Sequence, residues 1–151
     1  MLPPTLMPHL PVLRSLAEVV DVVRAHDAMY LRYSEGPEED LSGPSSRDYE
    51  ADVDLPGLSV TVATPEPWWL RPVEDWVARR LCKYAELGAA AGRFPWLLTG
   101  RPVGNGPDHE PLVDQVRPVA RVGDEAVREA VRLYHGRFNA GEDSREHDSP
   151  R

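Results

Sequence analysis

Three segments of the chain repeat apolar residues at the spacing of an amphipathic helix. The first covers residues 15–26, where Ser15 and, three residues later, Glu18 form a capping box. The second covers residues 72–88, and the third covers residues 123–138. Their apolar stripes consist of Leu16, Val19, Val20 and Val23 in the first, Val73, Trp76, Val77, Leu81 and Tyr84 in the second, and Val127, Ala130, Val131, Tyr134 and Phe138 in the third.

Between these helices, apolar and polar residues alternate in short stretches that are typical of strands with one covered face. Pro111 and Pro118 direct the last two stretches to a sheet edge or a bulge, because proline donates no hydrogen bond to a neighbouring strand. The elements lack the strand–helix–strand alternation of a parallel sheet. We therefore expect an α+β fold, with a mixed, mostly antiparallel sheet of about five short strands packed by three helices. The expected strands are 30–34, 57–62, 96–103, 110–113 and 116–122.

Composition divides the chain into one domain and two flanking segments. With 151 residues, 41% of them apolar, the chain is large enough for one hydrophobic core. We expect an irregular N-terminal arm over 1–14, a single globular domain over 15–138 and a disordered polar tail over 139–151. Residues 35–54 carry eight acidic side chains among Ser, Gly and Pro, a composition that predicts a long mobile loop.

The formal charge of −8 is unevenly distributed along the chain. Residues 1–70 hold four basic and twelve acidic side chains, whereas residues 71–137 hold eleven basic and nine acidic ones. An acidic chain is a poor general binder of nucleic acid, because neutralisation of phosphates supplies most of that affinity. Bulk DNA or RNA binding is therefore disfavoured, but the more basic half is able to hold one small anion.

Several kinds of site find no support in the sequence. No apolar run approaches the roughly 20 residues that span a bilayer, so no membrane contact is expected. The segment before Arg14 lacks the basic start of a signal peptide, and the single cysteine, Cys82, is consistent with a reducing, cytoplasmic location. The five histidines are scattered without the spacing of metal ligands, so we expect no metal site. Neither a nucleophile elbow nor a phosphate-binding glycine loop is present.

Polar side chains on the expected strands are the remaining candidates for a catalytic or binding site. Arg32 and Ser34 share one face of an early strand, and Ser59 and Thr61 share the polar face of the next. An arginine holds phosphate or carboxylate bidentately, and hydroxyl groups beside it bind ribose. A carboxylate such as Glu110, at the start of a later strand, is able to stabilise an oxocarbenium ion. These residue types suit a small anionic or nucleotide ligand and the cleavage of a glycosidic bond.

The order of Arg32, Ser59 and Glu110 on successive strands resembles the Arg–Ser–Glu arrangement of ADP-ribosyltransferases. The resemblance implies that Arg32 contacts a nicotinamide dinucleotide, that Ser59 supports the nicotinamide ribose, and that Glu110 is the catalytic residue. Ser34 and Thr61 would complete the cofactor-binding set. NAD would then be the substrate, and no other cofactor is implied.

Two other interpretations stay open, and the sequence does not decide whether the domain is an enzyme. Each polar residue is also consistent with an ordinary strand surface, with Arg32 paired to Glu35 or Asp54. The second alternative is a non-catalytic module that binds a protein partner through the acidic 35–54 loop together with Trp68 and Trp69. Of the 17 basic residues, 16 are arginine, and the chain as a whole is similar to an uncharacterised family of small actinobacterial proteins of unknown function.

The tryptophans around residue 70 divide between core and surface. Trp76 belongs to the apolar stripe of the second helix and is assigned to the core. Trp68 and Trp69 are adjacent and cannot both point inward, so one of them is expected to be exposed. Asp75 is expected to face solvent as the i,i+4 partner of Arg79.

Overall fold

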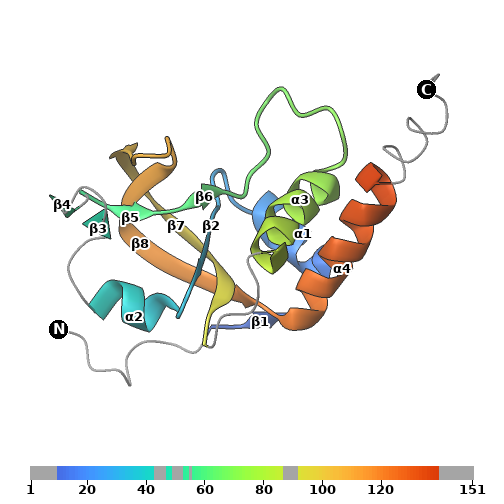
Figure 1. Cartoon of the computed structure of the whole chain (residues 1–151), viewed down its shortest axis with the longest axis horizontal. Helices are drawn as coiled ribbons and strands as arrows, with labels where there is room; N and C mark the ends of the chain where they lie inside the picture. The colour runs from blue at the N-terminus through green and yellow to red at the C-terminus, as the bar shows by residue number, and fades with distance from the viewer. Residues whose placement is uncertain (1–9, 43–46, 49–52, 55, 87–91, 140–151) are drawn as a thin grey trace.

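The computed structural model of the chain describes residues 10–42, 47–48, 53–54, 56–86 and 92–139. Over these residues the fold is α+β, as expected, with the helices of residues 16–24, 73–86 and 124–134 on one side of a curled, mostly antiparallel sheet and the short helix of residues 37–42 apart from them (Figure 1). None of the helices in these ranges is long and apolar enough to cross a membrane. Most of the expected N-terminal arm, and the expected tail from residue 140 onward, lie outside the described residues.

The first helix begins where the sequence places its cap. The Ser15 side chain accepts a hydrogen bond from the backbone N–H of Glu18 at 3.2 Å, and the Glu18 carboxylate accepts one from the backbone N–H of Arg14 at 3.2 Å. These two hydrogen bonds stabilise the start of the first helix. The helices are α1 Leu16–Arg24, α2 Pro37–Ser42, α3 Val73–Glu86 and α4 Asp124–Tyr134, the last followed by a π-helical turn, His135–Asn139.

A long hairpin forms the centre of the sheet. Its strands, β7 Phe94–Asn105 and β8 Pro111–Val122, each span 12 residues and are antiparallel. On one side β7 pairs with β2 Tyr30–Ser34, which in turn pairs with β6 Thr61–Val62. On the other side β8 pairs with β1 Val12–Leu13, in the one parallel contact of the described sheet.

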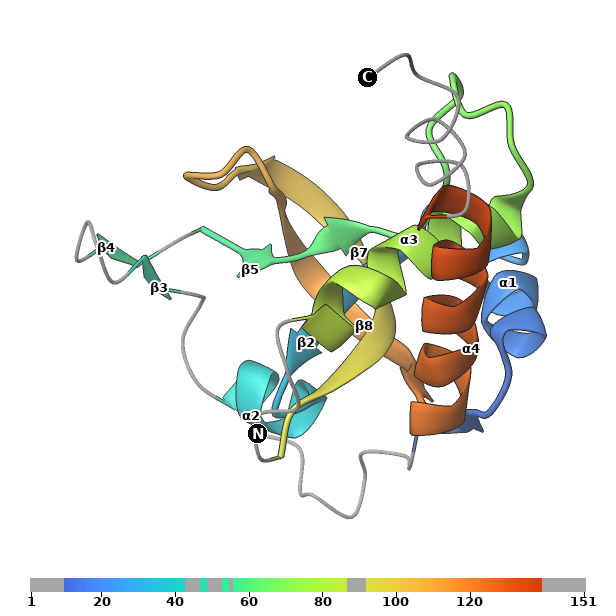
Figure 2. The same ribbon diagram turned by 45° about the vertical axis from the view of Figure 1, so that its right-hand side comes forward.

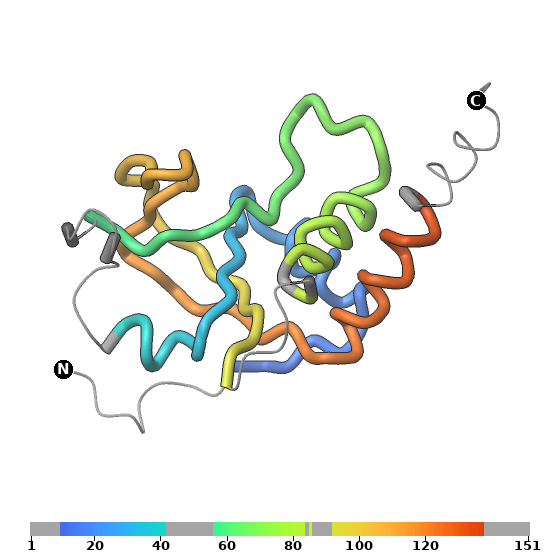
Figure 3. Tube along the Cα trace, in the orientation of Figure 1, coloured from blue at the N-terminus to red at the C-terminus, as the bar shows by residue number. Residues whose placement is uncertain are grey.

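Residues 58–62 close the curled sheet on itself. Their second half, β6, pairs with β2, whereas their first half, β5 Leu58–Ser59, pairs with β8. At the change of partner, the N–H of Val60 donates to the carbonyl oxygen of Pro111 at 3.0 Å. Figure 3 shows this segment running from the turn end of the β7–β8 hairpin to β2. The strands β8, β7, β2 and the pair β5 and β6 therefore form a small closed ring.

The sheet separates two hydrophobic clusters. Successive β7 residues alternate between them: Leu97 faces the helices, whereas Trp96 and Leu98 face the inside of the curl. The buried residues of the inner cluster come from the strands, except Val60, which lies between β5 and β6: they are Tyr30, Leu58, Val60, Trp96, Leu98 and Val113. The outer cluster is made by the helices and the opposite sheet face, and its members include Leu16, Val19, Val20, Val23, Leu31, Trp76, Val77, Leu81, Leu97, Val122, Ala126 and Ala130.

Three segments differ from the sequence-based expectation. The expected mobile loop over 35–54 contains helix α2 and a separate two-stranded pair, β3 Arg47–Asp48 with β4 Val53–Asp54. Pro37 suits the first turn of α2. Three acidic residues in the same turn stabilise the helix through their interaction with the positive end of its dipole. The two strands expected at 110–113 and 116–122 are one strand, because register shifts along the hairpin accommodate the prolines. Val12 and Leu13, within the expected irregular arm, form strand β1.

Candidate functional site

The Arg32 guanidinium lies on the inner face of the sheet, where two other elements engage it. Its Nε donates to Asp40 Oδ2 at 2.7 Å and its Nη2 to Asp40 Oδ1 at 3.4 Å. Its Nη1 donates to the main-chain carbonyl oxygen of Ser59 at 2.7 Å. The exposed fractions of the two paired side chains are 24% for Arg32 and 13% for Asp40. Arg32 of β2 therefore connects this strand with both α2 and β5 through hydrogen bonds.

Ser34 completes the same network. Its hydroxyl donates to Asp40 Oδ2 at 2.5 Å and accepts the indole N–H of Trp96 at 3.0 Å and the N–H of Gly36 at 3.1 Å. The serine is buried, as is Trp96, so these contacts satisfy polar groups at the end of the inner cluster. Among the described side chains, Arg32 is paired with Asp40 and not with Glu35, because α2 returns the chain toward β2. The side chain of Asp54, the other expected partner, lies outside the described residues.

The remaining candidate residues lie on neighbouring segments. Ser59, on β5, stands opposite Leu112 of β8, and Thr61, on β6, stands opposite Leu31 of β2. Glu110 lies in the turn that joins β7 and β8, and its carboxylate accepts the N–H of Asp108 at 2.9 Å. The structure thus brings the main chain of Ser59 against Arg32. Glu110 lies two residues before Leu112, the partner of Ser59, but its carboxylate closes the hairpin turn.

A second region of interest is the connection between β6 and α3, which projects from the body of the molecule in Figures 1 and 2. Within it, Trp68 is 65% exposed and Leu70 is 95% exposed. Trp69 is partly covered: its indole N–H donates to the carbonyl oxygen of Pro72 at 3.1 Å, and its backbone N–H donates to Glu66 at 3.0 Å. The expectation that one of the two adjacent tryptophans is exposed is confirmed.

The three tryptophan rings form an edge-to-face cluster that braces this connection. The ring centroids lie 6.1 Å apart for Trp68 and Trp69, 5.8 Å for Trp68 and Trp76, and 5.1 Å for Trp69 and Trp76. Trp76 is only 2% exposed, as expected for a core residue of α3. The exposed ring of Trp68 is thereby anchored to the core through two aromatic contacts.

Comparison with known families places the chain among proteins without an assigned activity. The model of the Family of unknown function (DUF6098) matches residues 7–146. The chain belongs to this family. No match was found among curated proteins or among solved structures. Because the family carries no assigned activity, the function of this member is argued from its geometry.

Asp75, at the start of α3 in this family member, is a fully buried carboxylate and not a surface residue. It accepts from Arg71 Nε at 3.2 Å, and Arg137 Nε lies 3.8 Å from Asp75 Oδ1. The expected pairing with Arg79 is therefore wrong, because α4 and the turn that follows it cover this side of α3. Within the described residues, Asp75 Oδ1 and the indole N–H of Trp76 are buried without a hydrogen-bond partner.

Other chemistry finds little support in the part of the chain that the structure describes. No group of three or more His, Cys, Asp and Glu residues is arranged there to hold a metal ion. Cys82 is buried in α3, so its thiol is not presented to solvent. Leu70 was missed by sequence reasoning, although it stands between a proline-rich stretch and a helix and belongs to no apolar stripe.

Proposed function

We propose that the domain is a non-catalytic module that binds a protein partner through Trp68 and Leu70. The observation that supports this proposal is the exposure of both side chains, 65% and 95%, on one projecting connection. Single exposed apolar residues are common on protein surfaces, but tryptophan is among the residues enriched at interface hot spots, and Leu70 adds exposed apolar area on the same connection as Trp68.

The connection is held in shape before any partner binds. Three prolines at positions 65, 67 and 72 restrict its backbone, and Trp69 is fixed by its hydrogen bond to Pro72. Trp68 is fixed by its contacts with the neighbouring rings. Because less conformational entropy is lost when a rigid segment binds, this bracing favours affinity.

The complementary surface of the partner is expected to be an apolar pocket. Trp68 and Leu70 alone do not supply the roughly 800 Å² that each side of a stable interface buries, so the surrounding surface must contribute. Helix α2, with its acidic residues, lies at a different end of the molecule in both Figure 1 and Figure 2. The interface is therefore centred on the connection, without α2.

Site-specific cross-linking tests this function. A photoreactive residue in place of Leu70 should trap a partner in cells, whereas the same residue in place of Arg117, an exposed position on β8, should not. With the partner purified, Trp68→Ser should weaken binding at least tenfold, and Arg117→Gln should change it less than about twofold. Equal trapping at both positions, or unchanged affinity for Trp68→Ser, would contradict the proposal.

We propose an ADP-ribosyltransferase-like binder of NAD as a second candidate. The supporting observation is that Arg32 contacts the main chain of Ser59, whose strand pairs with the first residues of β8 after Glu110. Arginine has five N–H donors, and the hydrogen bonds to Asp40 and Ser59 engage three of them. Ser34 and Thr61 accompany this set as in the sequence-based hypothesis.

A thermal-shift titration with NAD tests the second candidate independently of the first. NAD at about 1 mM should raise the melting temperature of the wild-type protein, because a ligand that binds only the folded state stabilises it. Glu110→Gln and Arg32→Lys should reduce that shift, whereas Arg117→Gln should preserve it. If no shift occurs in the wild-type protein, or if all variants shift alike, this candidate is excluded. Neither result bears on the cross-linking experiment.

A further inference from the structure

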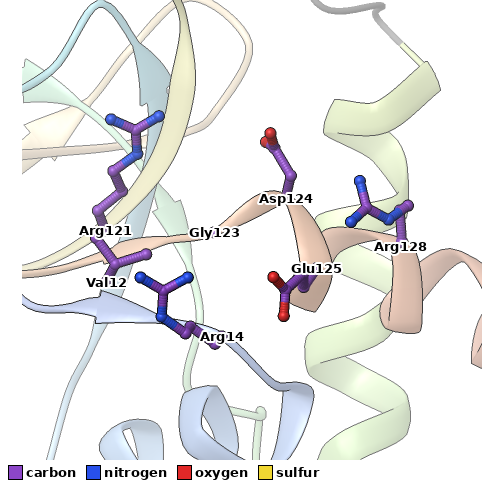
Figure 4. Close-up of a pocket in the computed structure, with 7 residues that line it drawn as sticks. All are labelled: Val12, Arg14, Arg121, Gly123, Asp124, Glu125 and Arg128. Carbon is purple, nitrogen blue, oxygen red and sulfur yellow. The ribbon is translucent and has the colours of Figure 1, made fainter.

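A cavity of about 290 Å³ opens where β1, β8 and the start of α4 meet, on a surface that neither proposed function uses. Three arginines line it: Arg14 after β1, Arg121 at the end of β8, and Arg128 in α4. Figure 4 shows Arg14 and Arg128 on opposite sides, with the carboxylates of Asp124 and Glu125 between them. The lining therefore combines three positive and two negative groups.

The three guanidinium groups have no hydrogen-bond or ion-pair partner among the described residues. Elsewhere in the fold, Arg32 and Arg101 bind carboxylates at 2.7 Å and 2.6 Å. Within the cavity only Arg121 has a marked contact, a cation–π interaction in which its guanidinium carbon lies 4.0 Å from the centre of the Phe94 ring. That contact fixes the side chain while leaving its N–H donors for a ligand.

The backbone around the cavity is built to bring these residues together. In the parallel pairing of β1 with β8, Val12 stands opposite Arg121, and the N–H of Gly123 donates to the carbonyl oxygen of Leu13 at 2.8 Å. A Cβ atom at residue 123 would lie 3.0 Å from both Leu13 O and Val12 Cγ1. Glycine thus permits the close approach that places Arg14 beside the first turn of α4.

We propose that this cavity binds a small phosphate monoester that also carries hydroxyl groups. Guanidinium groups recognise phosphate oxygens through paired, charge-assisted hydrogen bonds. Asp124 and Glu125 are hydrogen-bond acceptors, and they select a ligand whose uncharged part donates hydroxyl hydrogens. The net charge of the lining, one positive unit, favours a single anionic group over a polyanion. The volume suits a ligand of a few carbon atoms.

Isothermal titration of the full chain with glycerol 3-phosphate tests this proposal. Glycerol 3-phosphate should bind the wild-type protein, and glycerol should not. Arg14→Gln and Arg128→Gln should each weaken binding about tenfold, because each removes a charged hydrogen-bond donor. Arg117→Gln is the matched control, since it makes the same charge change at an exposed position outside the cavity, and it should alter affinity less than about twofold.

Two further results would overturn the proposal in whole or in part. If glycerol 3-phosphate gives no heat at about 10 mM, or binds equally to the wild-type protein and to the Arg14→Gln/Arg128→Gln double variant, the cavity is not the site. If inorganic phosphate binds as tightly as glycerol 3-phosphate, the anion site stands and the role given to Asp124 and Glu125 is wrong. Circular dichroism of each variant confirms that these exposed substitutions leave the fold intact.

Discussion

Asp40 on α2 holds Arg32 on β2 through two hydrogen bonds, the shorter of them 2.7 Å from Arg32 Nε to Asp40 Oδ2. The same oxygen also accepts the hydroxyl of Ser34. One carboxylate thus organises the polar end of the inner cluster, and α2 is attached to the sheet through it.

Replacing Asp40 should destabilise the domain as a whole. Asp40→Asn loses the ion pair and Asp40→Ala also leaves Ser34 without its acceptor, so we expect a reduction in the free energy of unfolding of about 2 kcal/mol for the alanine variant. Urea unfolding followed by tryptophan fluorescence measures the change. Glu38→Gln, an exposed charge on the same helix, should have an effect below about 0.5 kcal/mol. Equal effects of Asp40→Ala and Glu38→Gln would argue against a stabilising role of the contacts that Asp40 makes with Arg32 and Ser34.

Gly36 should not tolerate alanine. Its φ of +113° is a conformation that L-residues rarely adopt, and a Cβ atom there would lie 2.7 Å from Phe94 Cζ. Gly36→Ala is expected to cost about 1–3 kcal/mol in thermal or urea unfolding. Gly136→Ala is the matched substitution: a Cβ atom added at residue 136 would meet no atom within 4 Å, and the residue stands in a helical turn. That variant should be neutral or more stable by up to about 1 kcal/mol.

Arg71 should stabilise the fold chiefly by pairing with the buried carboxylate of Asp75. Among the described residues, Arg71→Ala leaves a fully buried carboxylate with only the longer contact to Arg137, and it should lower the free energy of unfolding by about 2 kcal/mol. In an Asp75→Asn background the same substitution should cost less than about 1 kcal/mol, because the buried charge is gone. A double-mutant cycle measures the difference, and additivity would show that Arg71 acts through other contacts.

The cross-strand pair of Arg101 and Asp114 should give stability that depends on pH. Hydrogen bonds from Arg101, at 2.8 Å and 2.6 Å, lower the pKa of Asp114 and its carboxylate raises the pKa of Arg101. A carboxylate whose pKa is lower in the folded than in the unfolded state stabilises the fold at pH values above its unfolded-state pKa of about 3.9. That contribution is lost as the pH falls through the folded-state pKa. The difference between wild type and Asp114→Asn in urea unfolding should therefore be larger at pH 7 than at about pH 3. A difference independent of pH would show that the pair is not responsible.

The sequence was informative where the physical cause is local. The cap at Ser15 with Glu18, and the apolar stripe of α1, act within one or two turns, so both could be read from neighbouring residues. Strand β2 was predicted with its bounds, because Tyr30 to Ser34 alternate within five residues. The fold class followed from the order of such elements.

The remaining features depend on residues far apart in the chain. Asp75 is buried because Arg137 and the end of α4 cover it, and no pattern around residue 75 records that partner. The pairing of Arg32 with Asp40 depends on a six-residue helix within an acidic stretch, where composition favoured a loop. Gln115, with φ at +51°, lies within β8 where the sequence indicated a break between two strands; the backbone is irregular there, but the strand continues.

Closure of the sheet by residues 58–62 also has a kinetic consequence. The β7–β8 hairpin joins residues that are close in sequence, and its strands can pair early. Residues 58–62 must instead find β2, about 30 positions earlier, and β8, about 50 positions later, before the inner cluster around Trp96 is sealed. We therefore expect docking of this short segment to be the slow step of folding. Because the hairpin is then already formed in the transition state, destabilising substitutions in its turn should slow folding, as should those at Val60.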